Sequence, residues 1–176
     1  ARAVSLLAVI PARLGATRLP RKPLRELGGA PLVVRVWERV TALGVADRVV
    51  VATDAEEVGH AVAAAGGEAV LTRGDHPSGT DRIAEVAALP EFATYDAVLN
   101  VQGDEPFVSG ALLRAAARLV TEGAFPLGTA ACPATPDVLA SPDVVKVVAT
   151  DEGRAMYFSR APIPFLRDAT DARELA

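Results

Sequence analysis

The chain has 176 residues, a length typical of one domain. Apolar residues make up 51% of it and charged residues 23%, which excludes a disordered chain and predicts a buried core. Its 18 basic and 22 acidic side chains give a formal net charge of -4, which excludes the overall positive field of proteins that bind nucleic acid or anionic membranes. An anionic ligand would have to be bound by a local group of cations.

The cysteine content and the first apolar run indicate a cytoplasmic protein. One cysteine, Cys132, excludes an internal disulfide, and two histidines beside it are too few for a zinc cluster. The run Leu6–Pro11 is far shorter than the roughly 20 residues that span a bilayer. We therefore expect neither a signal peptide nor a membrane anchor.

Taken in chain order, short apolar runs alternate with longer stretches of helical period. The runs predict strands at Ser5–Ile10, Arg48–Thr53, Ala69–Leu71 and Ala97–Val101. The stretches predict helices with apolar faces over residues 32–40, 58–65 and 112–119. The first helix is predicted to stop at Gly44 and the second at Gly66–Gly67. Asp54 with Glu57 predicts a capping box, and Ser109 predicts the N-cap of the third helix.

This alternation predicts the fold class. Strand, helix and strand in repetition favour a Rossmann-like α/β fold with a mainly parallel open sheet and helices on both faces, in a single domain over residues 1–176. Near the end, 144–150 and 155–159 predict a β-hairpin on the sheet edge. Ligands of such sheets bind outside the carboxyl ends of the strands, so the loops there carry the functional predictions.

The loop after the first strand concentrates positive charge. Residues 13–25 hold five basic side chains, which are Arg13, Arg18, Arg21, Lys22 and Arg25. Arginine and lysine in a loop fixed by prolines are suited to phosphate oxygens, although a solvated basic loop is the plain alternative. Neither a dinucleotide-binding glycine motif nor a P-loop motif is present.

Two further loops complete the predicted site. Thr72–Arg82 is a glycine-containing turn at a predicted helix N-terminus, which suits a polar base or an anion, although an ordinary capped loop is as good an interpretation. Within it, His76 is expected at the surface. Asp104, just beyond a buried strand, is a candidate Mg²⁺ ligand or a turn residue. Together with the basic loop it indicates a metal-bound polyphosphate.

A fourth segment lies near the end of the chain. Tyr157, Phe158 and Ile163 are expected in the core, as is Trp37 on the first helical stripe. Arg160, beside a strand end, is a candidate partner for a carboxylate.

These motifs resemble the 3-deoxy-manno-octulosonate (KDO) cytidylyltransferases, which are enzymes of the nucleotide-diphospho-sugar transferase type of fold. The resemblance runs from about Leu7 to Asp168, with alanine at position 16 where the family commonly has serine. It depends on Ile10–Leu24, Ala52–Asp54, Thr72–Glu85, Asn100–Pro106 and Val145–Pro164. It implies that the anomeric hydroxyl of KDO attacks the α-phosphorus of CTP, which gives CMP-KDO and pyrophosphate for lipopolysaccharide synthesis.

The resemblance also implies roles for individual residues. The implied catalytic residues are Lys22, Arg13 and Asp104, with Asp104 as the Mg²⁺ ligand. The implied CTP-binding residues are Pro11, Ala12, Arg13, Arg18, Lys22, Arg73, Ser78 and Gly79. The implied sugar-acid contacts are Gln102 and Arg160.

The family resemblance extends to assembly and leaves alternatives open. Family members are typically homodimers, and they continue beyond the point where this sequence stops, so we expect this chain to lack the family's C-terminal portion. A cytidylyltransferase for another sugar acid, such as sialic acid, is the alternative within the enzymes. A catalytically silent nucleotide-binding module is the alternative outside them.

Overall fold

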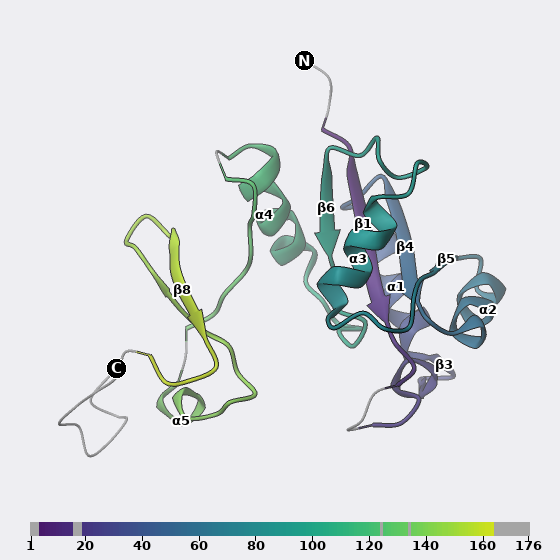
Figure 1. Ribbon diagram of the computed structural model, residues 1–176, viewed down its shortest axis with the longest axis horizontal. Coiled ribbons are helices and arrows are strands. Elements are labelled where there is room, and N and C mark those ends of the chain that lie inside the picture. Colours follow the sequence, from purple (N-terminus) through teal and green to yellow (C-terminus); the bar gives the residue numbers. More distant parts are fainter. Residues whose placement is uncertain (1–3, 16–18, 124, 134, 164–176) are drawn as a thin grey trace. The chain divides into compact units, whose positions relative to one another are not determined.

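The four apolar runs predicted as strands form one parallel sheet in the computed structural model, which describes residues 4–15, 19–123, 125–133 and 135–163. The strands are β1 (Leu6–Ala12), β4 (Arg48–Thr53), β5 (Glu68–Leu71) and β6 (Ala97–Asn100). They lie in the order β5-β4-β1-β6, with β1 in the interior of the sheet (Figure 1). The order and the parallel pairing confirm the predicted Rossmann-like α/β fold.

The three stretches of helical period form helices, and a further helix begins at the predicted helix N-terminus within Thr72–Arg82. In chain order they are α1 (Leu32–Leu43), α2 (Glu56–Ala64), α3 (Gly79–Ala87) and α4 (Gly110–Thr121). Between β1 and α1 lie the short 3-10 helix η1 (Lys22–Leu24) and the antiparallel pair β2 (Glu26–Leu27) and β3 (Ala30–Pro31). Within the ranges that the structure describes, no helix combines the length and the apolar character needed to cross a membrane.

The side chains of β1 alternate between the two faces of the sheet, so each face has its own apolar core. Ala8 and Ile10 pack with buried residues of α1, α2 and α4, such as Val36. Leu7 and Val9 pack on the opposite face with α3. Helices therefore cover both faces, as continuous apolar strands require.

Most of the predicted helix ends are confirmed. Gly44 ends α1 with a left-handed backbone at φ 57°, and Gly66 follows α2 at φ 84°. Ser109 is the N-cap residue of α4, although its side chain makes no capping hydrogen bond. Trp37, on the apolar stripe of α1, is partly buried against the core.

The predicted capping box of Asp54 and Glu57 is wrong. The N-cap residue of α2 is Ala55, which has no side chain that could cap the helix. The Asp54 carboxylate instead accepts hydrogen bonds from the Leu14 amide and the Arg82 guanidinium. Those distant donors replace the local one that the sequence spacing suggested.

A second compact unit lies within residues 130–176, after the sheet unit of residues 1–129. It contains α5 (Pro136–Leu139), β7 (Lys146–Ala149) and β8 (Ala155–Ser159). The antiparallel pair β7 and β8 confirms the hairpin, but the two strands form a sheet of their own and not an edge of the parallel sheet. The buried Lys146 ammonium donates to the carbonyls of Ser141, Val144 and Arg160. A single domain over residues 1–176 stays a prediction.

The aromatic residues of β8 contradict the expectation that they belong to the core. Tyr157 is 62% exposed and Phe158 is 48% exposed, while Ile163 is partly buried. A two-stranded hairpin has too little apolar surface of its own to cover such side chains. Their apolar character suggested burial, but the sequence of a strand does not show which elements cover it.

Candidate functional site

Three of the predicted site segments lie around the carboxyl end of β1. This strand has β4 on one side and β6 on the other. The order in which the chain adds strands to the sheet therefore changes direction at β1. In open α/β sheets, ligands bind outside the carboxyl ends of the strands at such a point. The three segments follow β1, β5 and β6, and we call them the phosphate loop (residues 13–24), the base loop (residues 72–78) and the acid loop (residues 101–109).

An ion pair joins the phosphate loop to the acid loop. The Lys22 ammonium donates a hydrogen bond to the Asp104 carboxylate, although 82 positions separate the two residues. The side chains are 36% and 47% exposed, so a ligand in solvent can reach both. The structure thus brings together the cation and the carboxylate that the sequence predicted separately.

The backbone before Lys22 is held in an uncommon conformation. Arg21 has φ 57°, in the left-handed region that costs a non-glycine residue roughly 1–2 kcal/mol. Its guanidinium forms a paired contact with Glu57 of α2 at 2.9 and 2.5 Å, which raises the pKa of Arg21 above its ordinary value. Pro23, next to Lys22, is buried. These contacts fix the turn from which the Lys22 side chain extends.

The acid loop passes very close to β1. A Cβ atom at Gly103 would lie 2.6 Å from the carbonyl oxygen of Pro11, nearer than side chains can approach. Only glycine therefore allows the loop to run against the strand end at this point. This close approach places Asp104, the following residue, beside the phosphate loop.

The base loop leads into α3, as predicted for a helix N-terminus. Ser78 is the N-cap residue, and its hydroxyl oxygen accepts a hydrogen bond from the Asp81 amide at 3.2 Å. A Cβ atom at Gly79 would lie 3.3 Å from the Pro11 ring, so the base loop also meets the end of β1. The Arg73 side chain is 70% exposed, and its Nε lies 3.6 Å from the Asp75 carboxylate and 3.9 Å from the Glu85 carboxylate.

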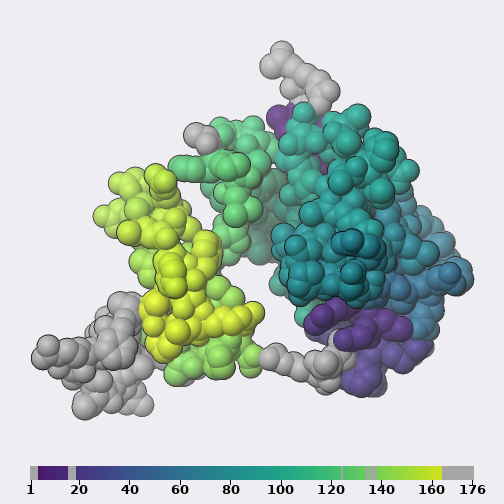
Figure 2. Space-filling view, viewed as in Figure 1, coloured from purple at the N-terminus to yellow at the C-terminus, as the bar shows by residue number. Residues whose placement is uncertain are grey.

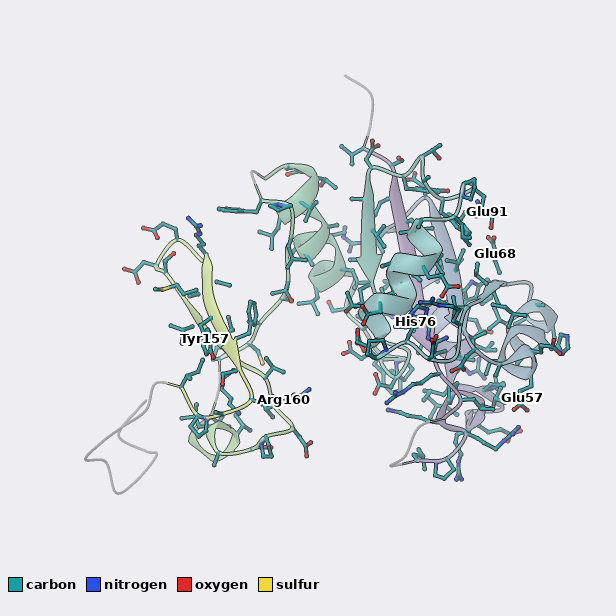
Figure 3. The ribbon with its side chains drawn as sticks, in the orientation of Figure 1. Glu57, Glu68, His76, Glu91, Tyr157 and Arg160 are labelled. Atoms are coloured by element: carbon teal, nitrogen blue, oxygen red, sulfur yellow. The ribbon has the colours of Figure 1, made fainter. Side chains whose placement is uncertain are left out.

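His76 is not the surface residue that the sequence suggested. Its side chain is 4% exposed and its ring contacts the Glu85 carboxylate of α3 through Nε2, where Figure 3 places it against that helix. The same carboxylate accepts a hydrogen bond from the Arg73 amide at 3.2 Å. The pKa of Glu85 is lowered below its ordinary value, mainly by the hydrogen bond with His76 and to a smaller extent by the hydrogen bond from the Arg73 amide.

The other predicted residues of the sheet unit lie near the same strand ends. Ala12 is buried at the end of β1, and Arg13, the next residue, is exposed. Gln102 donates to the Asn100 side chain at 3.1 Å within the acid loop region. On the surface in Figure 2, the purple segment after β1 adjoins the teal segment of α3. Arg18 lies outside the described residues.

Arg160 belongs to the second unit. Its guanidinium donates to the carbonyl of Pro142 at 2.9 Å and to that of Asp143 at 3.3 Å. Figure 3 labels it at the end of β8, close in sequence to the exposed Tyr157. The carboxylate partner expected for Arg160 stays a prediction.

The sequence interpretation assigned no role to Arg82. Its side chain is 2% exposed on α3 and donates to the Asp54 carboxylate at 3.0 Å and to the Arg73 carbonyl at 3.2 Å. A signal was present, because Arg82 lies four residues before Val86 on the apolar face of the helix. A charged residue on such a face needs buried partners.

Comparison with known proteins agrees with this geometry. The family model described as cytidylyltransferase matches residues 7–174. A curated 3-deoxy-manno-octulosonate cytidylyltransferase from Gemmatimonas aurantiaca is 67% identical over 171 residues, which cover 97% of this chain and 66% of that protein. The chain therefore spans about two thirds of the length of this relative.

Solved structures give the same result. A structure of CMP:2-keto-3-deoxy-manno-octonic acid synthetase complexed with CTP superposes with a TM-score of 0.79 at 38% identity, over 93% of this chain and 67% of that one. A cytidylyltransferase from Leptospira borgpetersenii, at 22% identity and a TM-score of 0.55 over 66% of this chain and 48% of its own, supports the fold alone. These matches confirm the resemblance that the motifs predicted. The chain belongs to the cytidylyltransferase family.

Proposed function

We propose that this chain carries the nucleotide-binding part of a cytidylyltransferase that transfers CMP from CTP to KDO. The anomeric hydroxyl oxygen of KDO forms a bond to the α-phosphorus of CTP, the bond from that phosphorus to the bridging oxygen breaks, and pyrophosphate leaves as the hydroxyl loses its proton. The observation that carries the proposal is the meeting of Lys22 and Asp104 at the end of β1 in a chain 67% identical to a relative of that name.

The residues of the phosphate loop would bind the triphosphate. Lys22 and Arg13 are exposed enough to contact phosphate oxygens, and Arg18 lies in the same loop of the sequence. Phosphoryl transfer depends mostly on positioning and on cations that stabilise the charge of the transition state. Pro11 and Ala12 would shape the strand end from which the loop begins.

Residues outside the phosphate loop would bind the base and the sugar acid. Arg73 with Ser78 and Gly79 would recognise cytosine, because the backbone donors at a helix N-terminus are suited to a flat polar base. Gln102 and Arg160 would contact the sugar acid, whose carboxylate matches a guanidinium fork.

The donor chemistry at Asp104 fits Mg²⁺. Mg²⁺ is commonly held by one or two carboxylates together with substrate phosphates, and the exposed Asp104 carboxylate faces the phosphate loop. Among the described residues there is no group of three or more His, Cys, Asp or Glu that could hold a metal. Phosphate oxygens of the substrate would share the coordination with Asp104. When bound, the ion would neutralise charge on the phosphates.

Wider assignments extend this proposal. We expect a cytoplasmic enzyme that acts as a homodimer in lipopolysaccharide synthesis, as the family resemblance implies. Transfer to another sugar acid, such as sialic acid, is the second candidate, because Gln102 and Arg160 are suited to any carboxylate of this type. A catalytically silent nucleotide-binding module is the third candidate.

A pyrophosphate-release assay on the full-length gene product that contains this sequence tests the proposal. We expect release with CTP and KDO, and turnover with ATP, GTP or UTP at least 100-fold lower, because sites built on hydrogen bonds reject mismatched partners by about 10⁴-fold or more. Sialic acid in place of KDO separates the two sugar-acid candidates. CTP binding without release with either acid would support the silent module, and equal turnover with UTP would refute the base-reading assignment.

A further inference from the structure

Arg82 is a buried cation outside the residues assigned to ligand binding. It is the largest fully buried side chain among the described residues, and its partners come from two different strand ends. One amino group donates to the Asp54 carboxylate after β4, and the other donates to the Thr72 hydroxyl and to the Arg73 carbonyl after β5. The guanidinium therefore occupies the point where α3 meets these two loops.

Asp54 carries this connection to a third segment. Its Oδ2 accepts from Arg82 at 3.0 Å, and its Oδ1 accepts from the Leu14 amide at 3.1 Å. Leu14 lies in the phosphate loop, one residue after Arg13. The Asp54 side chain is 17% exposed, so solvent weakens this connection little.

Glu85, one helical turn after Arg82, binds the other backbone polar group of Arg73. Its carboxylate accepts from the Arg73 amide at 3.2 Å, whereas Arg82 donates to the Arg73 carbonyl at 3.2 Å. Both backbone polar groups of Arg73 are thus bound by α3, while its 70% exposed side chain lies 3.6 Å from the Asp75 carboxylate and 3.9 Å from that of Glu85. The His76 ring contacts the same carboxylate and fixes its position further.

We propose that Arg82 is a positioning residue that sets the base loop and the phosphate loop in one fixed arrangement, through Arg73 on one side and through Asp54 and Leu14 on the other. Its role in nucleotide recognition depends on the proposed function, but the mechanical connection does not. Arg82 touches no ligand in this scheme and acts only through the loops that do.

The chemistry of arginine explains why this position carries it. A buried ion pair contributes little net stability compared with an apolar residue, because both charges lose their hydration. An apolar residue would leave the acceptors on Asp54, Thr72 and Arg73 without a donor. The planar guanidinium supplies five donors in a fixed fork, whereas lysine supplies a single ammonium that cannot reach acceptors on both sides at once.

Arg82→Lys therefore tests the proposal with the charge retained. Hydrogen exchange measured by NMR without nucleotide should become at least 10-fold faster at both the Arg73 and the Leu14 amides. Calorimetry on the full-length protein should give a loss of at least 10-fold in CTP affinity and in the preference for CTP over UTP, with a loss of about 3-fold for inorganic triphosphate. A general loss of folding would not change the CTP to UTP ratio in this way.

A second variant separates the two arms of the connection. Glu85→Ala should accelerate exchange at the Arg73 amide and leave the Leu14 amide unchanged, because Glu85 contacts the base loop alone. Its side chain is 29% exposed, so this variant keeps the test available if Arg82→Lys does not fold. Arg48→Lys is the matched control, since it breaks a paired contact with Glu68 at the amino end of β4 and should change none of these values.

The possible results separate the inference from the proposed function. Wild-type exchange rates and an unchanged CTP to UTP ratio in folded Arg82→Lys would overturn the inference, as would equal acceleration of both amides in Glu85→Ala. If wild-type protein fails to bind CTP while Arg82→Lys still accelerates both amides, the proposed function fails and the connection between the loops stands.

Discussion

Replacing Gly103 by alanine tests how closely the acid loop must approach β1. The added Cβ would lie 2.6 Å from the Pro11 carbonyl oxygen, while real Cβ atoms stay beyond 3.0 Å and ordinary contacts begin at 3.4 Å. Pro11 belongs to an interior strand that pairs with Ala52 of β4, so it cannot move easily. We therefore expect the acid loop to move outward by several tenths of an ångström.

The displacement should affect both stability and turnover. Overpacking of this kind costs about 1–3 kcal/mol, which corresponds to a fall in Tm of roughly 2–12 °C at about 2–4 °C per kcal/mol. Asp104 follows Gly103 directly and would move with the loop. Since a misplacement of about 1 Å can cost roughly 100-fold in rate, the smaller shift should lower kcat by about 10-fold.

Melting curves and the pyrophosphate-release assay on the full-length protein measure both effects. Gly59→Ala is the matched control, because Gly59 lies within α2 and a Cβ there would lie 3.8 Å from the Cβ of Ala69 in β5, an ordinary contact. Alanine within a helix is favoured over glycine by about 0.4–1 kcal/mol, so this variant should melt at the same or a higher temperature with unchanged activity. If Gly103→Ala behaves like the control in both assays, the close approach to Pro11 does not position the acid loop.

Three further variants test individual charges. Lys22→Met should lower kcat/KM by about 100- to 1,000-fold, the equivalent of ~2.7–4 kcal/mol, while Tm changes little because an exposed ion pair contributes about 0–1 kcal/mol. Its control, Arg25→Met, lies one residue beyond the phosphate loop and should leave both unchanged. Asp104→Asn keeps the shape and removes the charge, so activity should be absent throughout a Mg²⁺ titration, and a wild-type metal dependence would place the ligand elsewhere. Hydrogen bonding by His76 lowers the pKa of Glu85, so the carboxylate stabilises the fold above its unfolded pKa of about 4.3 and loses that contribution as pH falls through the folded pKa. Melting temperatures of wild type and Glu85→Gln should thus converge between about pH 7 and about pH 3, and a constant difference would contradict this account.

The sheet could be predicted because each strand carries its signal in its own residues. A strand buried on both faces is a continuous apolar run, and the bounds predicted for Arg48–Thr53 match β4 in full. Gly44 likewise ends α1 as predicted, because its left-handed conformation is a local property of glycine. Neither feature depends on distant parts of the chain.

Other features could not be predicted because their causes are tertiary. The spacing of Asp54 and Glu57 fits a capping box, yet the Leu14 amide and the buried Arg82 are stronger partners for the Asp54 carboxylate. Those donors come from positions 40 and 28 residues away, respectively. Tyr157 was misassigned for the same reason, since its burial depends on what covers a hairpin.

Pro11 explains why glycines occupy the start of α3 and the acid loop. Gly79 comes from the start of α3 and Gly103 from the acid loop, and a Cβ on either would press against Pro11, at 3.3 and 2.6 Å. The start of α3 and the acid loop therefore pack directly on the last residues of β1, just before the phosphate loop begins. In sequence the two glycines indicate turns, which any loop needs, and their shared partner emerges only when the strands are assembled. The end of β1 is thus the fixed point from which the base loop, the acid loop and the phosphate loop take their positions.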